Sequence, residues 1–256
     1  MLSEVDFGRT GLRVSRLCAG TGSSGNGAES MQGRQAPDEY ADVLERAFEL
    51  GIRFWDTALQ YGTHPHLRTA LARVGRQAVV IGSKTHAAGA EQARADVGRC
   101  LDEMGLERLD IILMHEVDSL EQLEQRQPAL AELERQRDQG RVAVVGLSTH
   151  SIDVLERICG DLRYGCVFTN YNLANLHMDA SIEDYETALK RAYAAGQGVY
   201  VHKTLAEGRL ADRFREALVH NLTRPFLHSV SVGMTSQEEV EAAWRVAQQH
   251  DVSSLP

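Results

Sequence analysis

Eight short apolar runs recur along the chain, and segments with helical periodicity separate them. The runs are VSRLCAG (14–20), IRFWDTA (52–58), AVVIGSK (78–84), LDIILMH (109–115), VAVVGLS (142–148), CVFTNYN (166–172), GVYVHK (198–203) and SVSVGM (229–234). Nearly continuous apolar runs are typical of parallel strands that are covered on both faces. Eight strand–helix units close most naturally into an α/β (β/α)8 TIM barrel, with a doubly wound open sheet as the alternative.

The segments between the runs carry apolar residues at the spacing of an amphipathic helix, most clearly in 37–51, 91–105 and 184–196. Pro37 stands where a helix would begin. Gly51, Gly105 and Gly196 come directly after periodic segments, as expected for a residue that adopts a left-handed conformation at the end of a helix.

The chain length suits one such barrel, and we predict a single domain over residues 1–256. A second domain would need a linker, but the only Gly/Ser-rich stretch, 20–33, comes too early and predicts a long loop. Residues 6–17 place an Arg-Thr-Gly turn between two short extended runs, which predicts a hairpin capping the bottom of the barrel. After the eighth helix, at 236–250, only DVSSLP follows, so we expect little room for a C-terminal lid.

Charge and cysteine usage limit the possible partners and the compartment. The net charge of −9 argues against nucleic acid as a partner, although local basic groups or helix N-termini could still hold a phosphate. The four cysteines, Cys18, Cys100, Cys159 and Cys166, form no CxxC pair, which predicts reduced thiols and no metal cluster. No signal peptide and no apolar run of about 18 residues is present, so we expect a soluble, cytoplasmic protein without a membrane partner.

Four polar residues mark the ends of three consecutive strands. Asp56 ends the second apolar run, Lys84 the third and His115 the fourth, while Tyr61 lies in the loop after the second run. Taken alone, each has an ordinary explanation, such as an N-cap for Asp56. In a parallel barrel, however, the active site lies at the C-terminal ends of the strands, so these side chains are predicted to converge.

The types of these four residues indicate proton donation to an oxyanion. A free tyrosine has a pKa near ~10, and an ammonium within about 4–6 Å lowers it. Lys84 could supply that field while Asp56 keeps it charged, and His115 could orient a carbonyl oxygen beside Tyr61.

These residues resemble the aldo/keto reductase family. The similarity runs in order through FGRTGLRVSRLCAGTG, GIRFWDTALQYG, IGSKT, DIILMHEVD, GRVAVVGLSTH, TNYNL, GVYVHKTLAEGRL and SVGMTS. It implies a barrel that binds a nicotinamide cofactor, usually NADPH, and passes a hydride to a carbonyl carbon. Tyr61 would then be the general acid, Lys84 and Asp56 would tune its pKa, and His115 would orient the carbonyl.

The resemblance also implies the residues that hold the cofactor. Ser148 would hydrogen-bond the nicotinamide carboxamide, and the remaining expected contacts are Thr149, Asn170, His202, Lys203, Leu205, Gly233, Met234, Thr235, Ser236 and Glu239.

Several of these positions depart from the family pattern. Thr149 replaces a usual Asn, and His202 stands where many members stack an aromatic residue on the nicotinamide. After the last strand, Thr235, Ser236 and two glutamates replace the usual basic residues. A carboxylate would repel a 2′-phosphate but could accept a ribose hydroxyl, so NADH is possible as well as NADPH.

Three functions follow, in order of preference. The first is a metal-free, NAD(P)H-dependent reductase of small aldehydes or ketones, with the loop 21–36 as the main candidate for a substrate wall. The second is a catalytically silent cofactor-binding or regulatory barrel, suggested by the altered nicotinamide contacts. The third is a Schiff-base lyase built on Lys84. The other histidines, including His64, His66, His86 and His150, are expected mostly as solvated residues near loops. The one short pair, His64 and His66, lies where a helix should start and has no evident third ligand, so no metal site is expected.

Overall fold

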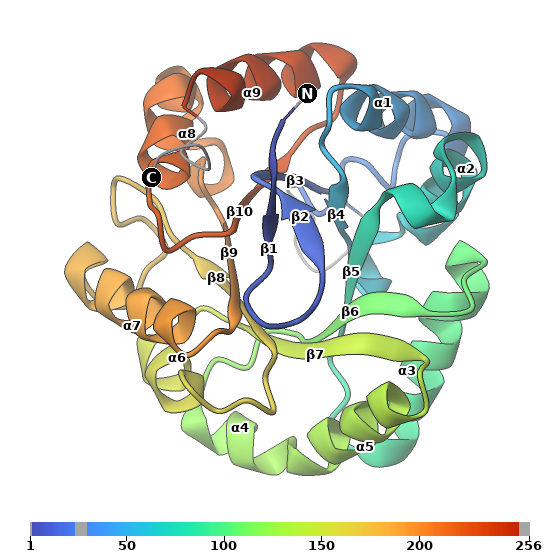
Figure 1. Ribbon diagram of the computed structural model, residues 1–256, viewed down its shortest axis with the longest axis vertical. Coiled ribbons are helices and arrows are strands. Elements are labelled where there is room, and N and C mark those ends of the chain that lie inside the picture. Colours follow the sequence, from blue (N-terminus) through green and yellow to red (C-terminus); the bar gives the residue numbers. More distant parts are fainter. Residues whose placement is uncertain (1, 24–29, 251–256) are drawn as a thin grey trace.

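Eight parallel strands close into a barrel in the computed structural model, which describes residues 2–23 and 30–250 (Figure 1). The strand order around the barrel is β10-β3-β4-β5-β6-β7-β8-β9. The strands are β3 Leu17–Gly20, β4 Phe54–Asp56, β5 Val80–Thr85, β6 Leu109–Met114, β7 Val142–Thr149, β8 Cys166–Asn170, β9 Gly198–His202 and β10 Ser229–Gly233. The predicted (β/α)8 barrel is confirmed, and the open-sheet alternative is wrong because β10 pairs with β3.

A ring of helices surrounds the barrel (Figure 1). The helices are α1 Pro37–Glu49, α2 His64–Val74, α3 Ala90–Met104, α4 Leu120–Gln125, α5 Gln127–Asp138, α6 Ile152–Ile158, α7 Ile182–Ala194, α8 Phe214–Leu222 and α9 Gln237–Gln249. Short 3-10 turns add η1 Leu59–Tyr61, η2 Arg76–Ala78, η3 Ala206–Gly208 and η4 Ala211–Arg213. Pro37 is the first residue of α1, and Gly51, Gly105 and Gly196 adopt the expected positive φ of 90°, 68° and 86°.

The core has two layers, because successive side chains of a strand point to opposite faces. On β4, Trp55 points outward into the large cluster between strands and helices, whereas Phe54 packs inside the barrel with Phe168 and Tyr200. Asp56, two residues after Phe54, therefore also faces the barrel axis. This alternation brings a carboxylate into the interior at the C-terminal end of the strand.

An antiparallel hairpin precedes the barrel and closes its bottom, as the sequence predicts (Figure 1). Its strands are β1 Glu4–Asp6 and β2 Arg13–Ser15, so the predicted run 14–20 divides between hairpin and barrel. Phe7, between these strands, is fully buried against Phe54 and Tyr200. A Cβ on Gly198 would lie 2.5 Å from the Phe7 ring, so only glycine fits where the hairpin meets β9.

Candidate active site

A buried ion pair connects the ends of β4 and β5. Lys84 Nζ donates to Asp56 Oδ2 at 2.5 Å and to the carbonyl oxygen of Thr57 at 2.7 Å. Lys84 is 0% exposed and Asp56 is 3% exposed. The hydroxyl of Tyr200, on β9 across the barrel, donates to Asp56 Oδ1 at 3.1 Å. Both carboxylate oxygens are therefore satisfied without water.

Each member of the pair stabilises the charged form of the other. Burial raises the pKa of Asp56, and the charge of Lys84 opposes that shift. Burial alone would lower the pKa of Lys84, but Asp56 raises it above its ordinary value. Lys84 therefore stays cationic at neutral pH, next to the phenol it was predicted to influence.

Tyr61 lies at the mouth of the barrel, by which we mean the end formed by the C-termini of the strands. It is the last residue of η1, and Gly62 ends that turn with a φ of 73°. Lys84 Nζ lies 4.9 Å from the centroid of the Tyr61 ring, and the Tyr61 hydroxyl lies 3.5 Å from His115 Nε2. A Cβ on Gly22 would approach the ring to 2.6 Å, so this glycine leaves the space that the phenol occupies.

The expected net lowering of the Tyr61 pKa is wrong. Burial raises the pKa of Tyr61 above its ordinary value, and the charge and hydrogen bond of Lys84 only partly offset this. The neighbouring carboxylates of Asp56 and Glu116 add to the increase. The lysine acts in the predicted direction, but desolvation outweighs it, so the phenol is held in its protonated form.

His115 follows β6 directly and is 4% exposed. Burial, and then the charge of Lys84, lower the pKa of His115 well below its ordinary value, so the ring is neutral. The side-chain amide nitrogen of Gln60 lies 2.7 Å from Nδ1. Because that amide donates, the ring proton is assigned to Nε2, which faces Tyr61. The neutral imidazole can thus donate to an oxygen placed beside the phenol.

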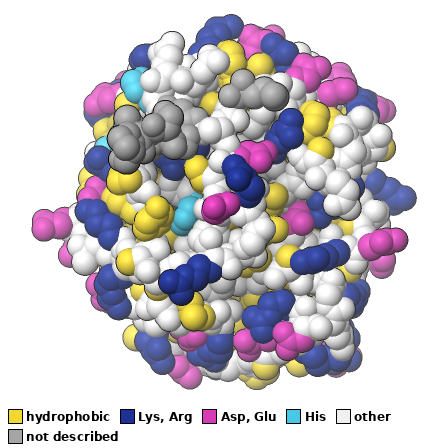
Figure 2. Space-filling model, viewed as in Figure 1, with side chains coloured by type: hydrophobic (Ala, Val, Ile, Leu, Met, Phe, Trp, Pro, Cys, Tyr) yellow, Lys and Arg dark blue, Asp and Glu magenta, His cyan; other side chains and the backbone are white. Residues whose placement is uncertain are grey.

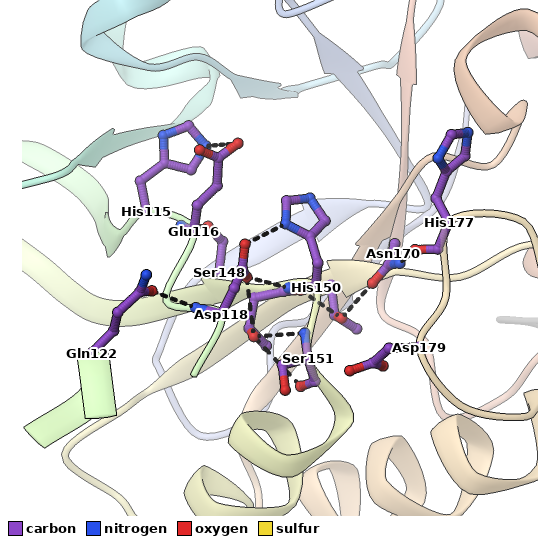
Figure 3. Close-up of polar contacts among 12 residues, drawn as sticks. His115, Glu116, Asp118, Gln122, Ser148, His150, Ser151, Asn170, His177 and Asp179 are labelled. Carbon is purple, nitrogen blue, oxygen red and sulfur yellow. Dashed lines mark hydrogen bonds and ion pairs between the residues drawn. The ribbon is translucent and has the colours of Figure 1, made fainter. Parts of the chain in front are cut away.

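Ser148 and Asn170, which are expected at the nicotinamide, hydrogen-bond to neighbouring protein groups (Figure 3). Ser148 Oγ accepts from the amide of Glu116 at 2.9 Å, which leaves its own proton for another acceptor. Asn170 Nδ2 donates to the carbonyl of His177, and its Oδ1 accepts from Thr169 Oγ1 at 3.2 Å. Thr149 Oγ1 accepts from the amide of Ser151 at 2.9 Å.

The last residue of β9, His202, presents an imidazole, a smaller aromatic ring than the family resemblance leads one to expect there. The His202 ring packs on Phe168, with centroids 4.4 Å apart, and against His150 at 5.3 Å. Burial, and then His150, lower the pKa of His202 well below its ordinary value. Lys203 adopts a positive φ of 54°, and its Nζ lies 2.8 Å from Glu207. Leu205 packs against the small cluster around Ala206, so it supports this loop.

The loop after β10 brings the remaining predicted cofactor residues to the first turn of α9. Ser236 caps the helix by accepting from the amide of Glu239 at 3.3 Å. Glu239 Oε2 accepts from the backbone amide of Thr235 at 2.6 Å and from its hydroxyl at 3.0 Å. Gly233 is exposed and Met234 is buried. The Glu239 carboxylate therefore already occupies both hydrogen-bond donors of Thr235.

The predicted substrate wall, 21–36, is described only in part, because residues 24–29 lie outside the described residues. In its described part, Gln32 Nε2 contacts the carbonyl oxygen of Gly20, at the end of β3, at 3.4 Å. Ser30 Oγ donates to the carbonyl of Tyr61 at 3.1 Å, and Gln32 Nε2 contacts the carbonyl of Met234 at 3.4 Å. The loop thus connects the phenol with the α9 end of the mouth.

Two of the histidines expected in solvated loops are buried instead. His64 and His66 belong to α2 and are 1% and 3% exposed. His64 lies 2.7 Å from Glu103 and 3.1 Å from Ser83 Oγ, so it links α2 to α3 and β5. The prediction is wrong for these two because neighbouring elements cover them. Side chains of α3 and β5 bond both ring nitrogens of His64, and the carbonyl oxygen of Gln35 lies 2.8 Å from His66 Nε2. Sequence spacing does not show these contacts. His86 is exposed, as predicted.

Sequence reasoning missed several residues around the four predicted ones: Gly22, Gln60, Glu116 and Tyr200. Gln60 and Glu116 adjoin Tyr61 and His115 in sequence, and this adjacency was the available signal. Tyr200 had none, because an aromatic residue in a strand normally indicates core packing.

Known proteins share sequence similarity with this chain. A model of the Aldo/keto reductase family matches residues 16–256. L-galactose dehydrogenase of Arabidopsis thaliana is 26% identical, over 92% of this chain and 85% of that protein. L-glyceraldehyde 3-phosphate reductase of Escherichia coli K12 is also 26% identical, over 81% of this chain and 62% of that protein. The chain thus spans less than two thirds of the second relative.

Solved structures share the architecture. An aldo-keto reductase structure from Pseudomonas aeruginosa superposes with a TM-score of 0.82 at 26% identity, covering 96% of this chain and 95% of the other. An aldo-keto reductase from Bacillus halodurans, in its holo form, superposes with a TM-score of 0.78 at 16% identity, covering 98% of this chain and 95% of the other. The second likeness concerns the fold alone.

Proposed function

Because this chain belongs to the aldo/keto reductase family, a family of oxidoreductases, we propose that it reduces a small aldehyde or ketone to an alcohol with a nicotinamide cofactor. Residues 1–256 act as one domain in this proposal. The observation that carries it is the meeting of Tyr61, Lys84, Asp56 and His115 at one end of the barrel.

Tyr61 is the proton donor in this scheme. A substrate carbonyl oxygen placed between the Tyr61 hydroxyl and His115 Nε2 would accept a hydrogen bond from each. The bound dihydronicotinamide would supply the hydride to the carbonyl carbon. As negative charge develops on the oxygen, the phenol transfers its proton, and the Lys84 ammonium stabilises the phenolate that remains. Asp56 and Tyr200 keep that ammonium in place.

The residues around the mouth suit a nicotinamide dinucleotide. Ser148 keeps a hydroxyl proton for a carboxamide oxygen, and His202 offers a ring face near Phe168. At the other end, Thr235 and the N-cap Ser236 lead into the first turn of α9, whose first backbone amides have no partner within the helix. These groups, with Thr149, Asn170, Lys203, Leu205, Gly233 and Met234 around them, are the proposed cofactor contacts.

NADH is the better fit of the two nucleotides, although the family resemblance alone favours NADPH. Glu239 occupies the amide and hydroxyl of Thr235, at 2.6 and 3.0 Å. A 2′-phosphate at this position would meet a carboxylate, whereas a ribose hydroxyl could donate to it. We therefore assign the choice of nucleotide to Glu239.

The proposed partners are small carbonyl compounds, and the proposed compartment is the cytoplasm. All four cysteines are free thiols, which suits a reducing compartment. Among the described residues, no helix combines the length and apolar character that a bilayer crossing requires.

The test is to titrate NADH and NADPH separately into the purified chain, following cofactor fluorescence, and then to measure reduced-nucleotide oxidation over a panel of aldehydes and ketones. We expect binding of both nucleotides, tighter for NADH, and turnover with part of the panel. Absence of both nucleotide binding and turnover would refute the proposal.

A cofactor-binding barrel without turnover is the second candidate, and the internal hydrogen bonds of Thr149 and Asn170 favour it. It predicts nucleotide binding but no substrate-dependent oxidation in the same assay. A Schiff-base lyase on Lys84 is disfavoured, since Asp56 raises the pKa of that amine and an attacking amine must be neutral. Borohydride trapping of a carbonyl compound on Lys84 would instead favour the Schiff-base lyase.

A further inference from the structure

We propose that the rim of the mouth binds a divalent cation of the zinc class through His86, His115 and Glu116. One ligand atom from each of these residues lies within 4.8 Å of the other two. Sequence spacing predicted no metal site, because His86 is 30 residues before Glu116, and only the neighbouring strands β5 and β6 bring them together.

The distances suit a tetrahedral ion. His86 Nε2 lies 3.0 Å from Glu116 Oε2, and His115 Nε2 lies 3.9 Å from Glu116 Oε1. Donors at about 2.0–2.1 Å from zinc are roughly 3.3 Å apart in a tetrahedron, between these two separations. The two imidazole rings are stacked, with centroids 4.5 Å apart. Because the lone pair of an imidazole nitrogen lies in the ring plane and these planes are 22° apart, binding requires the exposed His86 ring to turn until its nitrogen and His115 Nε2 point at one ion.

The backbone around these ligands is fixed by a buried guanidinium. Arg126 donates to the carbonyl oxygens of Thr85, Ala87 and His115 at 2.8, 3.0 and 2.7 Å. Two of these carbonyls flank His86, and the third belongs to a ligand. The backbone that carries His86 and His115 is thus held before any ion arrives, which reduces the ordering that binding would require.

Gln60 can support a metal-bound His115. Its side-chain amide contacts Nδ1 at 2.7 Å, so the second ring nitrogen, Nε2, is the one that faces Glu116. When Nε2 binds an ion, Nδ1 carries the proton, and a rotated Gln60 amide can accept it through its oxygen. Such a partner for the non-ligating nitrogen accompanies most histidine ligands.

The donor set selects the class of ion. Two imidazoles and one carboxylate match the three protein ligands of open zinc sites, whereas calcium and magnesium prefer oxygen ligands alone. His86 and Glu116 are exposed, so an ion can enter from solvent. The fourth position would be left for water.

The effect of a bound ion on activity rests on the proposed function. An ion on His115 Nε2 would remove the N–H that is directed at the carbonyl oxygen. Zinc should therefore inhibit reduction in competition with the carbonyl substrate, and His86→Gln should relieve that inhibition.

The test uses the chain without a histidine tag, nucleotide or substrate. Zn²⁺ is titrated calorimetrically, and Co²⁺ is followed by visible absorption. We expect one ion per chain, a tetrahedral cobalt spectrum, and affinity at least tenfold weaker in His86→Gln and in Glu116→Gln. The matched control is His150→Gln, which alters another histidine of the mouth, paired with Asp118 at 3.0 Å, and should bind as the unchanged chain does (Figure 3).

No saturable binding, or equal binding by His86→Gln and Glu116→Gln with circular dichroism confirming that both are folded, would overturn the metal site. Because this readout needs no turnover, it is independent of the reductase assay. A chain that binds zinc but reduces nothing would contradict the proposed function alone.

Discussion

At the scale of single residues, the energetically most demanding feature is the Asp56–Lys84 pair. Two charges lie out of water at 2.5 Å, and each is completed by neutral partners, Thr57 and Tyr200. Such a pair contributes little net stability compared with apolar residues, but its loss on one side leaves a buried charge. Its position next to Tyr61 is consistent with a role in proton transfer.

Lys84→Met should therefore destabilise the fold by about 3–5 kcal/mol, because Asp56 would remain buried without its cation. Urea denaturation at pH 7.5 measures this loss. The double variant Asp56→Asn/Lys84→Met should recover part of it, since neither charge remains. Equal stability of Lys84→Met and the unchanged chain would show that the two charges are not coupled as described.

At the scale of elements, strand ends were the most predictable feature and loops the least. The ends of β4, β5 and β6 could be placed because parallel strands must present their last residues at one mouth. The direction of the Tyr61 pKa shift could not be predicted, because desolvation of the phenol depends on how the chain packs around it, including the loop that contains Gly22. The same reason explains why the His86–Glu116 contact and the burial of His64 escaped prediction.

Among the elements, the first turn of α9 should decide the choice of nucleotide. Glu239→Lys removes the carboxylate from Thr235 and adds a cation, so kcat/KM for NADPH relative to NADH should rise tenfold or more. Steady-state kinetics with each nucleotide measures this ratio. Glu91→Lys, in the first turn of α3, makes the same charge change away from α9 and should leave the ratio unchanged. An unchanged ratio in Glu239→Lys would remove Glu239 from the nucleotide site.

At the scale of the whole molecule, the bottom of the barrel gives stability rather than chemistry. Basic and acidic side chains are interspersed over the face that carries the hairpin (Figure 2). Beneath this surface, His228 Nδ1 accepts from the amide of Val199 at 2.9 Å, and Phe7 packs against its ring. If Nδ1 were protonated, its N–H would face the backbone N–H of Val199, and the hydrogen bond between them would be lost.

The fold should therefore lose stability in acid, in part through His228. Burial, and then the charge of Arg16, lower the pKa of His228 to about 4, against an ordinary value of 6.5. The contribution of neutral His228 to the free energy of unfolding is fully present above pH 6.5. It is lost as the pH falls towards 4, because the unfolded chain binds the proton at a higher pH than the folded chain does. Lowering the pH from 7.5 to 5 should therefore reduce the free energy of unfolding by about 2 kcal/mol through His228.

Urea denaturation at the two pH values measures this loss, and His228→Asn is the comparison, because its side-chain oxygen can still accept from Val199. The variant should lose about 2 kcal/mol less than the unchanged chain on acidification. Identical losses would mean that His228 is not held neutral by the fold.

The measurement that tests the whole account most directly compares Tyr61→Phe with the unchanged chain in NADH-dependent reduction of a carbonyl compound. Removing one hydroxyl should lower kcat/KM by about 10²- to 10⁴-fold while the dissociation constant for NADH stays the same. A variant that binds NADH and still reduces the substrate within twofold of the original rate would contradict Tyr61 as the proton donor.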